Sequence, residues 1–251
     1  MPSLLRLAQR SRRKLPLPQL RAIALTVALA VLGIIVPMFT IDVPSIVAAR
    51  QLPAGVIAVF RELTDFANSA WFLWPLGILI AALGVAALVR PQARSTIEGP
   101  LEKLVFLFLV IALTRMSAYY GKYLFGRGRP FVGGEANAFV YDPFNPHPAY
   151  ASLPSGHAVT AFAVLAAFGM LWPRLYPALW VYAIVMGLCR VIITAHHPSD
   201  VVAGALWGVA GALLFRRIFA ARDLAFEVHR TKIVAKPGPG WATLRNALAK
   251  N

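Results

Sequence analysis

The feature that most constrains this chain is a series of long apolar runs separated by short charged segments. Residues 22–40 contain no charged side chain, and about 20 such residues suffice to cross the hydrocarbon core of a bilayer as a helix. Hydrophobic residues make up 59% of the 251 residues and charged residues only 14%, against about 25% charged in a typical soluble domain. This argues against a soluble enzyme and a disordered chain, and predicts an integral membrane protein.

Six runs are candidates for spanning helices. They cover residues 22–40, 71–89, 103–122, 158–172, 176–195 and 201–215. We therefore predict an all-α polytopic protein with one six-span domain over residues 22–219. Basic tails precede it at 1–21 and follow it at 220–251, the last fifteen or so residues being loose. A cleaved signal peptide is disfavoured for the first run, because that run is longer than a typical signal-peptide apolar region.

Lysine and arginine gather in alternate connecting segments, which predicts the orientation of the chain. The formal net charge is +15, and both tails and the segment from Arg90 to Lys103 are basic. We expect these segments in the cytoplasm of a bacterial cell, and residues 41–70, 123–157 and 196–200 on the periplasmic face of the inner membrane. Apolar residues at helical spacing within 41–70 predict an amphipathic helix, which lies on the membrane surface or packs against the bundle.

Polar residues crowd the expected outer face. Lys122, Arg129 and Arg190 bring three cations there; the arginine fork matches phosphoryl oxygens, and lysine adds a point charge. Ser155 and Gly156 directly precede an apolar run. Ser155 could cap that helix and Gly156 could let its backbone approach a ligand, leaving free N–H groups that bind anions. These features together indicate a phosphate site.

Histidines supply candidate catalytic groups at the same face. His157 falls in the first turn of the fourth span, and His196 and His197 lie four and three residues before Asp200. Either spacing lets the carboxylate orient an imidazole for attack, as in a catalytic triad. Few carboxylates are available for a two-metal site, and the lone Cys189 lies within a span. The composition therefore favours metal-free chemistry with a histidine nucleophile.

Three ordered motifs resemble those of the type 2 phosphatidic acid phosphatase (PAP2) family. The first, Lys-x6-Arg-Pro, begins at Lys122 and includes Arg129. The second, Pro-Ser-Gly-His, is residues 154–157. The third, Ser-Arg-x5-His-x3-Asp, runs from 189 to 200 with Cys189 in place of serine. Cysteine and serine are both small, so we expect this difference from the motif to have little effect on the site. The spacing of the third motif selects His196 over His197.

The resemblance implies a membrane-embedded lipid phosphatase without cofactor or metal. By it, His196 attacks phosphorus, Asp200 orients His196, and His157 protonates the leaving oxygen and later activates water. It also implies that the phosphoryl oxygens are held by a further set of residues, namely Lys122, Arg129, Ser155, Gly156 and Arg190. The expected partners are the bilayer and a lipid phosphate, such as phosphatidic acid, phosphatidylglycerol phosphate, undecaprenyl diphosphate or lipid A, and no nucleic acid.

Three alternatives share these motifs. A lipid phosphotransferase would use the same site and differ only in its product. Vanadium haloperoxidases contain similar motifs, but they are soluble proteins, whereas this chain is predicted to cross the membrane six times. A non-enzymatic protein built on a dead site conflicts with the intact motif residues. The natural lipid and the oligomeric state are not predicted.

Three further residues receive weaker predictions. Arg115, seven residues before Lys122 on the same helix face, either contacts the substrate or supports the site, or else forms one half of a structural ion pair, because a charge inside a span is usually functional or paired. Arg127 could contact a lipid head group, but it is predicted to be a solvated loop arginine. His197 is predicted to support its neighbours rather than to react.

Overall fold

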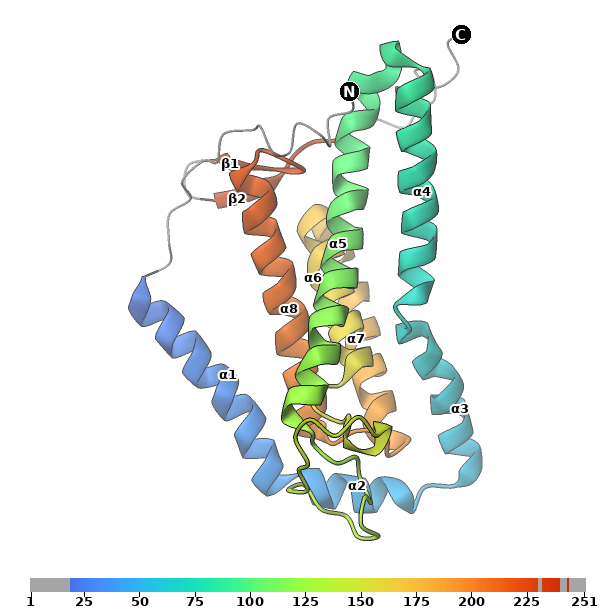
Figure 1. Cartoon of the computed structure of the whole chain (residues 1–251), viewed down its shortest axis with the longest axis vertical. Coiled ribbons are helices and arrows are strands. Elements are labelled where there is room, and N and C mark those ends of the chain that lie inside the picture. The colour runs from blue at the N-terminus through green and yellow to red at the C-terminus, as the bar shows by residue number, and fades with distance from the viewer. Residues whose placement is uncertain (1–18, 230–231, 240–242, 244–251) are drawn as a thin grey trace.

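The protein is a bundle of long helices (Figure 1). The computed structural model describes residues 19–229, 232–239 and 243. The α-helices of this part are α1 (Leu20–Thr40), α2 (Asp42–Arg50), α3 (Ala54–Thr64), α4 (Ala70–Val89), α5 (Arg94–Phe125), α6 (Gly156–Leu171), α7 (Tyr176–Ile192) and α8 (Pro198–Ala221). A short hairpin of β1 (Phe226–His229) and β2 (Lys232–Ala235) follows. The prediction of a mainly helical protein is confirmed.

Within the described residues, four helical segments are long and apolar enough to cross a membrane. They are Leu20–Thr40, Ala54–Val89, Pro173–Ile192 and Pro198–Ala221. Helix α6 is also apolar but has only 16 residues, and α5 has 32 residues that include Arg115 and Lys122. Most of the predicted basic tails, residues 1–18 and most of the chain after 239, lies outside the described part.

The close packing of α6 on α8 fixes the centre of the bundle. Gly204 and Gly208, four residues apart on α8, face the backbone of α6. A Cβ atom on either glycine would lie 2.5 Å from a carbonyl oxygen, that of Ser155 for Gly204 and that of Val159 for Gly208. Any side chain here would push the helices apart, so glycine lets the start of α6 approach the start of α8.

The end of the bundle that carries the hairpin contains a feature that the sequence analysis did not predict. Phe226 of β1 is buried, and its ring lies 4.8 Å from that of Phe106 on α5. The Glu102 carboxylate accepts a hydrogen bond from the Ala225 backbone N–H at 2.8 Å. The ordered fold therefore continues beyond residue 219, the predicted end of the domain, because aromatic burial anchors the hairpin to α5.

Residues 41–70 form two helices rather than one. Helix α2 is tilted across the end of the bundle opposite the hairpin, and α3 leads from it towards α4 (Figure 1). Phe60 and Leu63 of α3 pack against a buried cluster that includes Ala161, Ala183 and Met186. The apolar face of α3 therefore packs against the bundle, which was one of the two open interpretations.

Candidate active site

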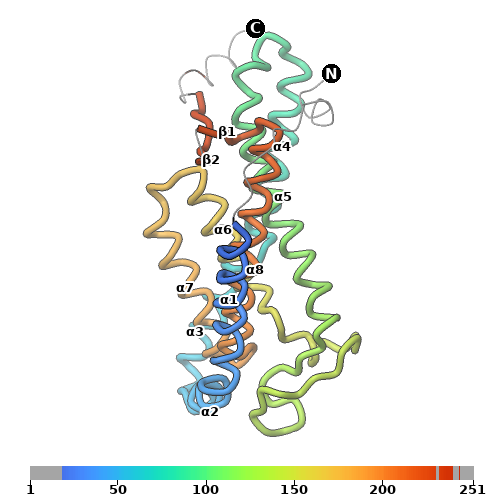
Figure 2. The backbone as a smooth tube through the Cα atoms, turned by 90° about the vertical axis from the view of Figure 1, so that its left-hand side faces the viewer, coloured from blue at the N-terminus to red at the C-terminus, as the bar shows by residue number. Residues whose placement is uncertain are grey.

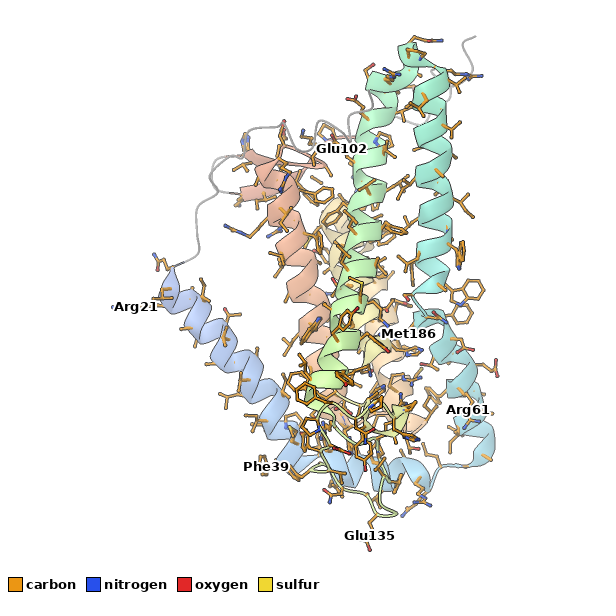
Figure 3. All side chains as sticks on the ribbon, viewed as in Figure 1. Arg21, Phe39, Arg61, Glu102, Glu135 and Met186 are labelled. Carbon is orange, nitrogen blue, oxygen red and sulfur yellow. The ribbon has the colours of Figure 1, made fainter. Side chains whose placement is uncertain are left out.

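The three predicted motifs meet at the end of the bundle where α5 ends, α6 begins, α7 ends and α8 begins. In Figure 3 this end of the bundle is the one where Glu135, on the loop between α5 and α6, is labelled. Glu102 is labelled towards the opposite end, near the hairpin. Figure 2 shows the same loop projecting sideways, and Figure 1 shows α1 approaching α8 near α2 and splaying away from it towards the other end. Alternation of helix direction brings residues 122–129, 155–157 and 190–200 together, as the sequence predicted.

Backbone hydrogen bonds hold these segments in place. The Ser155 N–H donates to the Asp200 carbonyl at 2.9 Å, which joins the starts of α6 and α8. The His196 N–H donates to the Arg190 carbonyl at 3.1 Å, after a turn in which Thr194 has a φ of 55°. This turn ends α7 at Ile192 and fixes His196 against Arg190.

A fully buried ion-pair network lies behind the motifs. The Arg127 guanidinium donates to Asp200 Oδ1 at 2.6 Å and to Asp42 Oδ2 at 2.8 Å, and all three side chains have no exposed surface. Its remaining groups donate to the Ala138 carbonyl and to Ser199 Oγ. The prediction that Arg127 is a solvated loop residue is therefore wrong, because two buried carboxylates require a cation between them.

Asp200 is oriented from several sides. Its Oδ2 atom accepts hydrogen bonds from Ser152 Oγ at 2.6 Å and from the His197 N–H at 2.9 Å. His196 Nδ1 lies 3.7 Å from the same oxygen and 3.4 Å from Ser152 Oγ. The carboxylate thus faces the Nδ1 edge of His196, which leaves the Nε2 edge for other chemistry.

The two neighbouring histidines differ in access. His197 Nδ1 lies 3.3 Å from Asp200 Oδ2, closer than His196. However, His197 Nε2 is buried and makes no hydrogen bond, and the residue serves as the N-cap of α8 in a capping box with Asp200. A ring held in this way has no nitrogen to offer a substrate. Both histidines therefore lie beside Asp200, but His197 is also fixed as the cap of α8.

Burial sets the protonation state of His196. The side chain is 2% exposed. Burial lowers the pKa of His196 well below its usual value, although the hydrogen bond to Asp200 acts in the opposite direction. Lys122 and Arg190 lower this pKa further by repulsion. The imidazole is therefore neutral at physiological pH, which is the state a nucleophile needs.

Four cations surround His157, and none has a carboxylate partner in the described part of the chain. They are Arg115, Lys122, Arg129 and Arg190. Lys122 Nζ donates to the Ala151 carbonyl at 2.5 Å, Arg129 to the Pro148 carbonyl, and Arg190 to Thr64 Oγ1. Arg190 Nε is buried without a partner. We call these four residues the unpaired cation cluster.

Helix α6 begins at this cluster. Ser155 occupies its N-cap position, but the predicted side-chain cap is not made: Ser155 Oγ is buried and has no hydrogen-bond partner. The first N–H groups of a helix have no partner within it, and together with the helix dipole they favour an anion. The position that a side chain on Gly156 would take is filled by the Arg115 guanidinium.

Other predicted features can be placed briefly. Cys189, which takes the place of the serine in the third motif, is fully buried in the apolar cluster with Ala161 and Met186. Among the described residues, no group of three or more histidine, cysteine or carboxylate side chains is arranged as a metal site.

Sequence reasoning missed Asp42, Ser152 and Ser199. Asp42 lies 85 residues before Arg127, and its only sequence signal is a carboxylate at the end of an apolar run. Arg127 forms a β-bridge with Tyr141, and strand alternation would place Arg127 and Arg129 on the same side, so no local pattern separated the buried arginine from the other.

Comparisons with known proteins agree with the motifs. Residues 103–223 match the PAP2 superfamily. A lipid A 1-phosphatase of Rhizobium johnstonii is 33% identical over 198 residues, which cover 78% of this chain and 80% of that protein. A lipid A 1-phosphatase of Rhizobium etli is 34% identical over 194 residues, which cover 76% of this chain and 82% of that protein. The chain belongs to the PAP2 superfamily.

A solved structure, that of LpxE from Aquifex aeolicus, is similar with a TM-score of 0.49 at 21% identity, covering 70% of this chain and 95% of that chain. The family membership, the apolar helices and the relatives identify the protein as a membrane-bound phosphatase that acts as a hydrolase on lipid phosphates.

Proposed function

We propose that this protein removes a phosphoryl group from a lipid head group through a phosphohistidine intermediate on His196. The observation that carries the proposal is the convergence of a buried, neutral histidine with the unpaired cation cluster at one end of the bundle. Cations without carboxylate partners repel one another, and a phosphate dianion between them would relieve that repulsion.

The proposed reaction assigns each group a role that its surroundings support. His196 Nε2 attacks phosphorus while Asp200 and Ser152 hold the Nδ1 edge. A bound phosphate dianion offsets the cations around His157, so that this half-buried imidazole in the first turn of α6 can hold the proton that it gives to the leaving oxygen, and it later takes one from water. Preorganised cations on the phosphoryl oxygens supply the electrostatic stabilisation that phosphoryl transfer requires. The proposed set is Lys122, Arg129, Arg190 and the α6 turn at Ser155 and Gly156.

We further propose that the reaction needs no metal ion. The two buried carboxylates nearest to the site, Asp42 and Asp200, already accept hydrogen bonds from Arg127. Carboxylates held by an arginine are poor ligands for a divalent ion. The cations of the cluster would take the place of a metal by neutralising phosphoryl charge.

For the topology we propose six spanning helices, namely α1, α4, α5, α6, α7 and α8. Alternation then brings the site, α2 and α3 to one face, which the distribution of lysine and arginine predicts to be the periplasmic face of an inner membrane. The catalytic domain of this proposal covers residues 22–219, and the chain packs onto it as far as the hairpin at 226–235.

The lipid substrate is proposed from the relatives and from an apolar groove. Both rhizobial relatives carry the name lipid A 1-phosphatase, which favours a phosphorylated glycolipid of this kind. A groove of about 940 Å³ lies between α1, α5 and α8. Its apolar lining includes Leu153 and Pro154, next to Ser155, so a hydrocarbon tail lying there would bring its head group to the site.

The experiment is phosphate release by detergent-purified protein in the presence of EDTA. The substrates are lipid A, undecaprenyl diphosphate, phosphatidylglycerol phosphate and phosphatidic acid, each tested with wild type, His196→Ala and His197→Ala. We expect release that survives EDTA, falls by about 10³-fold or more in His196→Ala, and is retained in part by His197→Ala. A requirement for metal, or activity without His196, would contradict the mechanism. Phosphate found on another lipid instead of in solution would show a phosphotransferase.

A further inference from the structure

Arg190 of the unpaired cation cluster is held by a residue that none of the three motifs includes. Its Nη1 atom donates to Thr64 Oγ1 at 3.2 Å, across 126 positions of the sequence. Within the described part of the chain this is the one hydrogen bond of the Arg190 side chain. Thr64 also lies outside residues 103–223, the part that matches the superfamily. The contact therefore adds to the site a residue from beyond the matched region.

Thr64 is the last residue of α3. Among the residues of this helix, all of which are described, Thr64 alone is buried, with 3% of its surface exposed. The neighbouring Phe60 and Leu63 pack against an apolar cluster, where valine would fill the same space as threonine. A hydroxyl at the one buried position needs a hydrogen-bond partner, and the Arg190 guanidinium is that partner.

The segment that carries Thr64 is fixed against α7 by contacts of its own. Tyr182 of α7 donates from its hydroxyl to the Phe66 carbonyl at 3.0 Å, and Ala67 is buried in the cluster with Ala183 and Met186 of α7. Tyr182 lies eight residues before Arg190 on the same helix. Thr64 is therefore held in place independently of Arg190 and offers a fixed acceptor for its guanidinium.

The hydrogen bond to Thr64 leaves one edge of the Arg190 guanidinium free. Its Nε atom is buried without a partner, and Nη2 donates to no residue in the described ranges. These two nitrogens form a planar edge that matches two oxygens of a phosphoryl group. Arg190 lies within electrostatic range of His157 and His196, so a phosphoryl group at the site could meet this edge.

A hydroxyl orients an arginine without neutralising it. Arg127 in the buried network is held by the carboxylates of Asp42 and Asp200, which would compete with any other anion. Asp65, the residue after Thr64, is exposed to solvent and makes no ion pair with Arg190 in the described part of the chain. The charge of Arg190 therefore stays available to a phosphate while its position is fixed.

We propose that Thr64 is a positioning residue, whose hydroxyl fixes the Arg190 guanidinium so that its Nε–Nη2 edge faces the phosphoryl oxygens. This inference rests on the proposed function, which supplies the phosphate. Thr64 acts through Arg190 and does not itself touch the substrate. Without the hydroxyl, Nη1 loses its acceptor and the guanidinium is free to turn, so the phosphate meets a donor that is no longer preorganised.

The test measures two quantities in wild type, Thr64→Val, Thr64→Ser and the control Thr40→Val. The first is the affinity for inorganic phosphate, from the rise of the thermal midpoint with phosphate concentration. The second is the kcat/KM of phosphate release from the lipids named above. The hydroxyl of Thr40 donates only within its own helix, to the Val36 carbonyl at 2.8 Å. We expect Thr64→Val to weaken both quantities by about 10-fold, and Thr64→Ser and the control to stay close to wild type.

A second set of variants asks whether Thr64 acts through Arg190. Lysine is a point charge with no planar edge to orient, so Thr64→Val should cause little further loss of phosphate affinity in an Arg190→Lys background. The full loss in that background would overturn the inference. So would equal phosphate affinity of wild type and Thr64→Val, or a loss that Thr64→Ser does not restore.

Thr64→Ala removes the same hydroxyl and carries the test if the valine variant does not fold. The proposed function is decided separately, by whether wild type releases phosphate from any of the lipids. The inference is decided by the difference in phosphate affinity between wild type and the Thr64 variants, so either can fail without the other.

Discussion

Two groups of charged residues lie side by side at the site end of the bundle, and they differ in whether their cations are paired with carboxylates. In the network behind the motifs, Arg127 is paired with Asp42 and Asp200, and all three are fully buried. In the unpaired cation cluster, no carboxylate meets Lys122 or Arg190 within the described residues, and Arg190 Nε is left without a partner. Paired charges of this kind hold a structure in place, whereas unpaired cations leave binding capacity for an anion.

The largest effect is expected where the paired network is broken. Arg127→Leu leaves Asp42 and Asp200 as buried carboxylates without a cation. Removing one partner of a buried pair typically destabilises by about 3–5 kcal/mol. We expect a strongly lowered thermal midpoint and loss of activity, measured by intrinsic fluorescence of the detergent-solubilised protein.

Asp42→Asn is the matched control for this variant, because it leaves the contact between Arg127 and Asp200 in place. Its loss of stability should be clearly smaller than that of Arg127→Leu. Equal stability of Arg127→Leu and wild type would show that the network does not hold the site together.

The unpaired cluster should respond in the opposite way. Lys122→Met removes a cation whose described contacts are the carbonyls of Ala151 and Ser152. We expect kcat/KM for phosphate release to fall by about 10²- to 10³-fold, as for the loss of one preorganised donor. The thermal midpoint should stay unchanged or rise, because repulsion within the cluster decreases. A marked loss of stability would place Lys122 with the structural charges instead.

A smaller effect is expected at the helix contact that brings the two groups together. Gly204→Val would press a side chain against the Ser155 carbonyl, where a Cβ atom alone would lie at 2.5 Å. Overpacking of this kind typically destabilises by about 1–3 kcal/mol. Gly84→Val on α4, where a Cβ meets nothing within 4 Å, is the control. Equal thermal midpoints for the two variants would contradict the close approach of α6 and α8.

The smallest effect concerns pH. Burial keeps the pKa of His196 well below its usual value in the folded protein, whereas an unfolded histidine titrates at about 6.5. The stability from this difference is present above about pH 6.5 and decreases as pH falls towards the folded pKa, by up to about 1.4 kcal/mol per unit. Thermal midpoints from pH 7 to 5 should fall less steeply in His196→Asn than in wild type. The exposed His229 gives the control His229→Asn, whose slope should equal that of wild type.

The sequence predicted the unpaired cluster better than the paired network, and the reason is physical. Lys122, His157, Arg190 and His196 lie at the ends of apolar runs, so the alternation of spans alone brings them to one face. The pairing of Asp42 with Arg127 joins residues 85 positions apart and depends on how α2 packs, which no local pattern reports. The hairpin was missed because its two strands have only four residues each. Nor does residue spacing reveal that Gly156 accommodates the Arg115 guanidinium.

The central claim is that the paired network presents a neutral His196 to a phosphate held by the unpaired cations. It is tested most directly by quenching the protein during turnover of a ³²P-labelled lipid phosphate and mapping the label by mass spectrometry. The account predicts a label that is stable in alkali, labile in acid and confined to the peptide at His196, and that is absent in His196→Ala. A label on His197, or turnover with no labelled protein at any quench time, would contradict it.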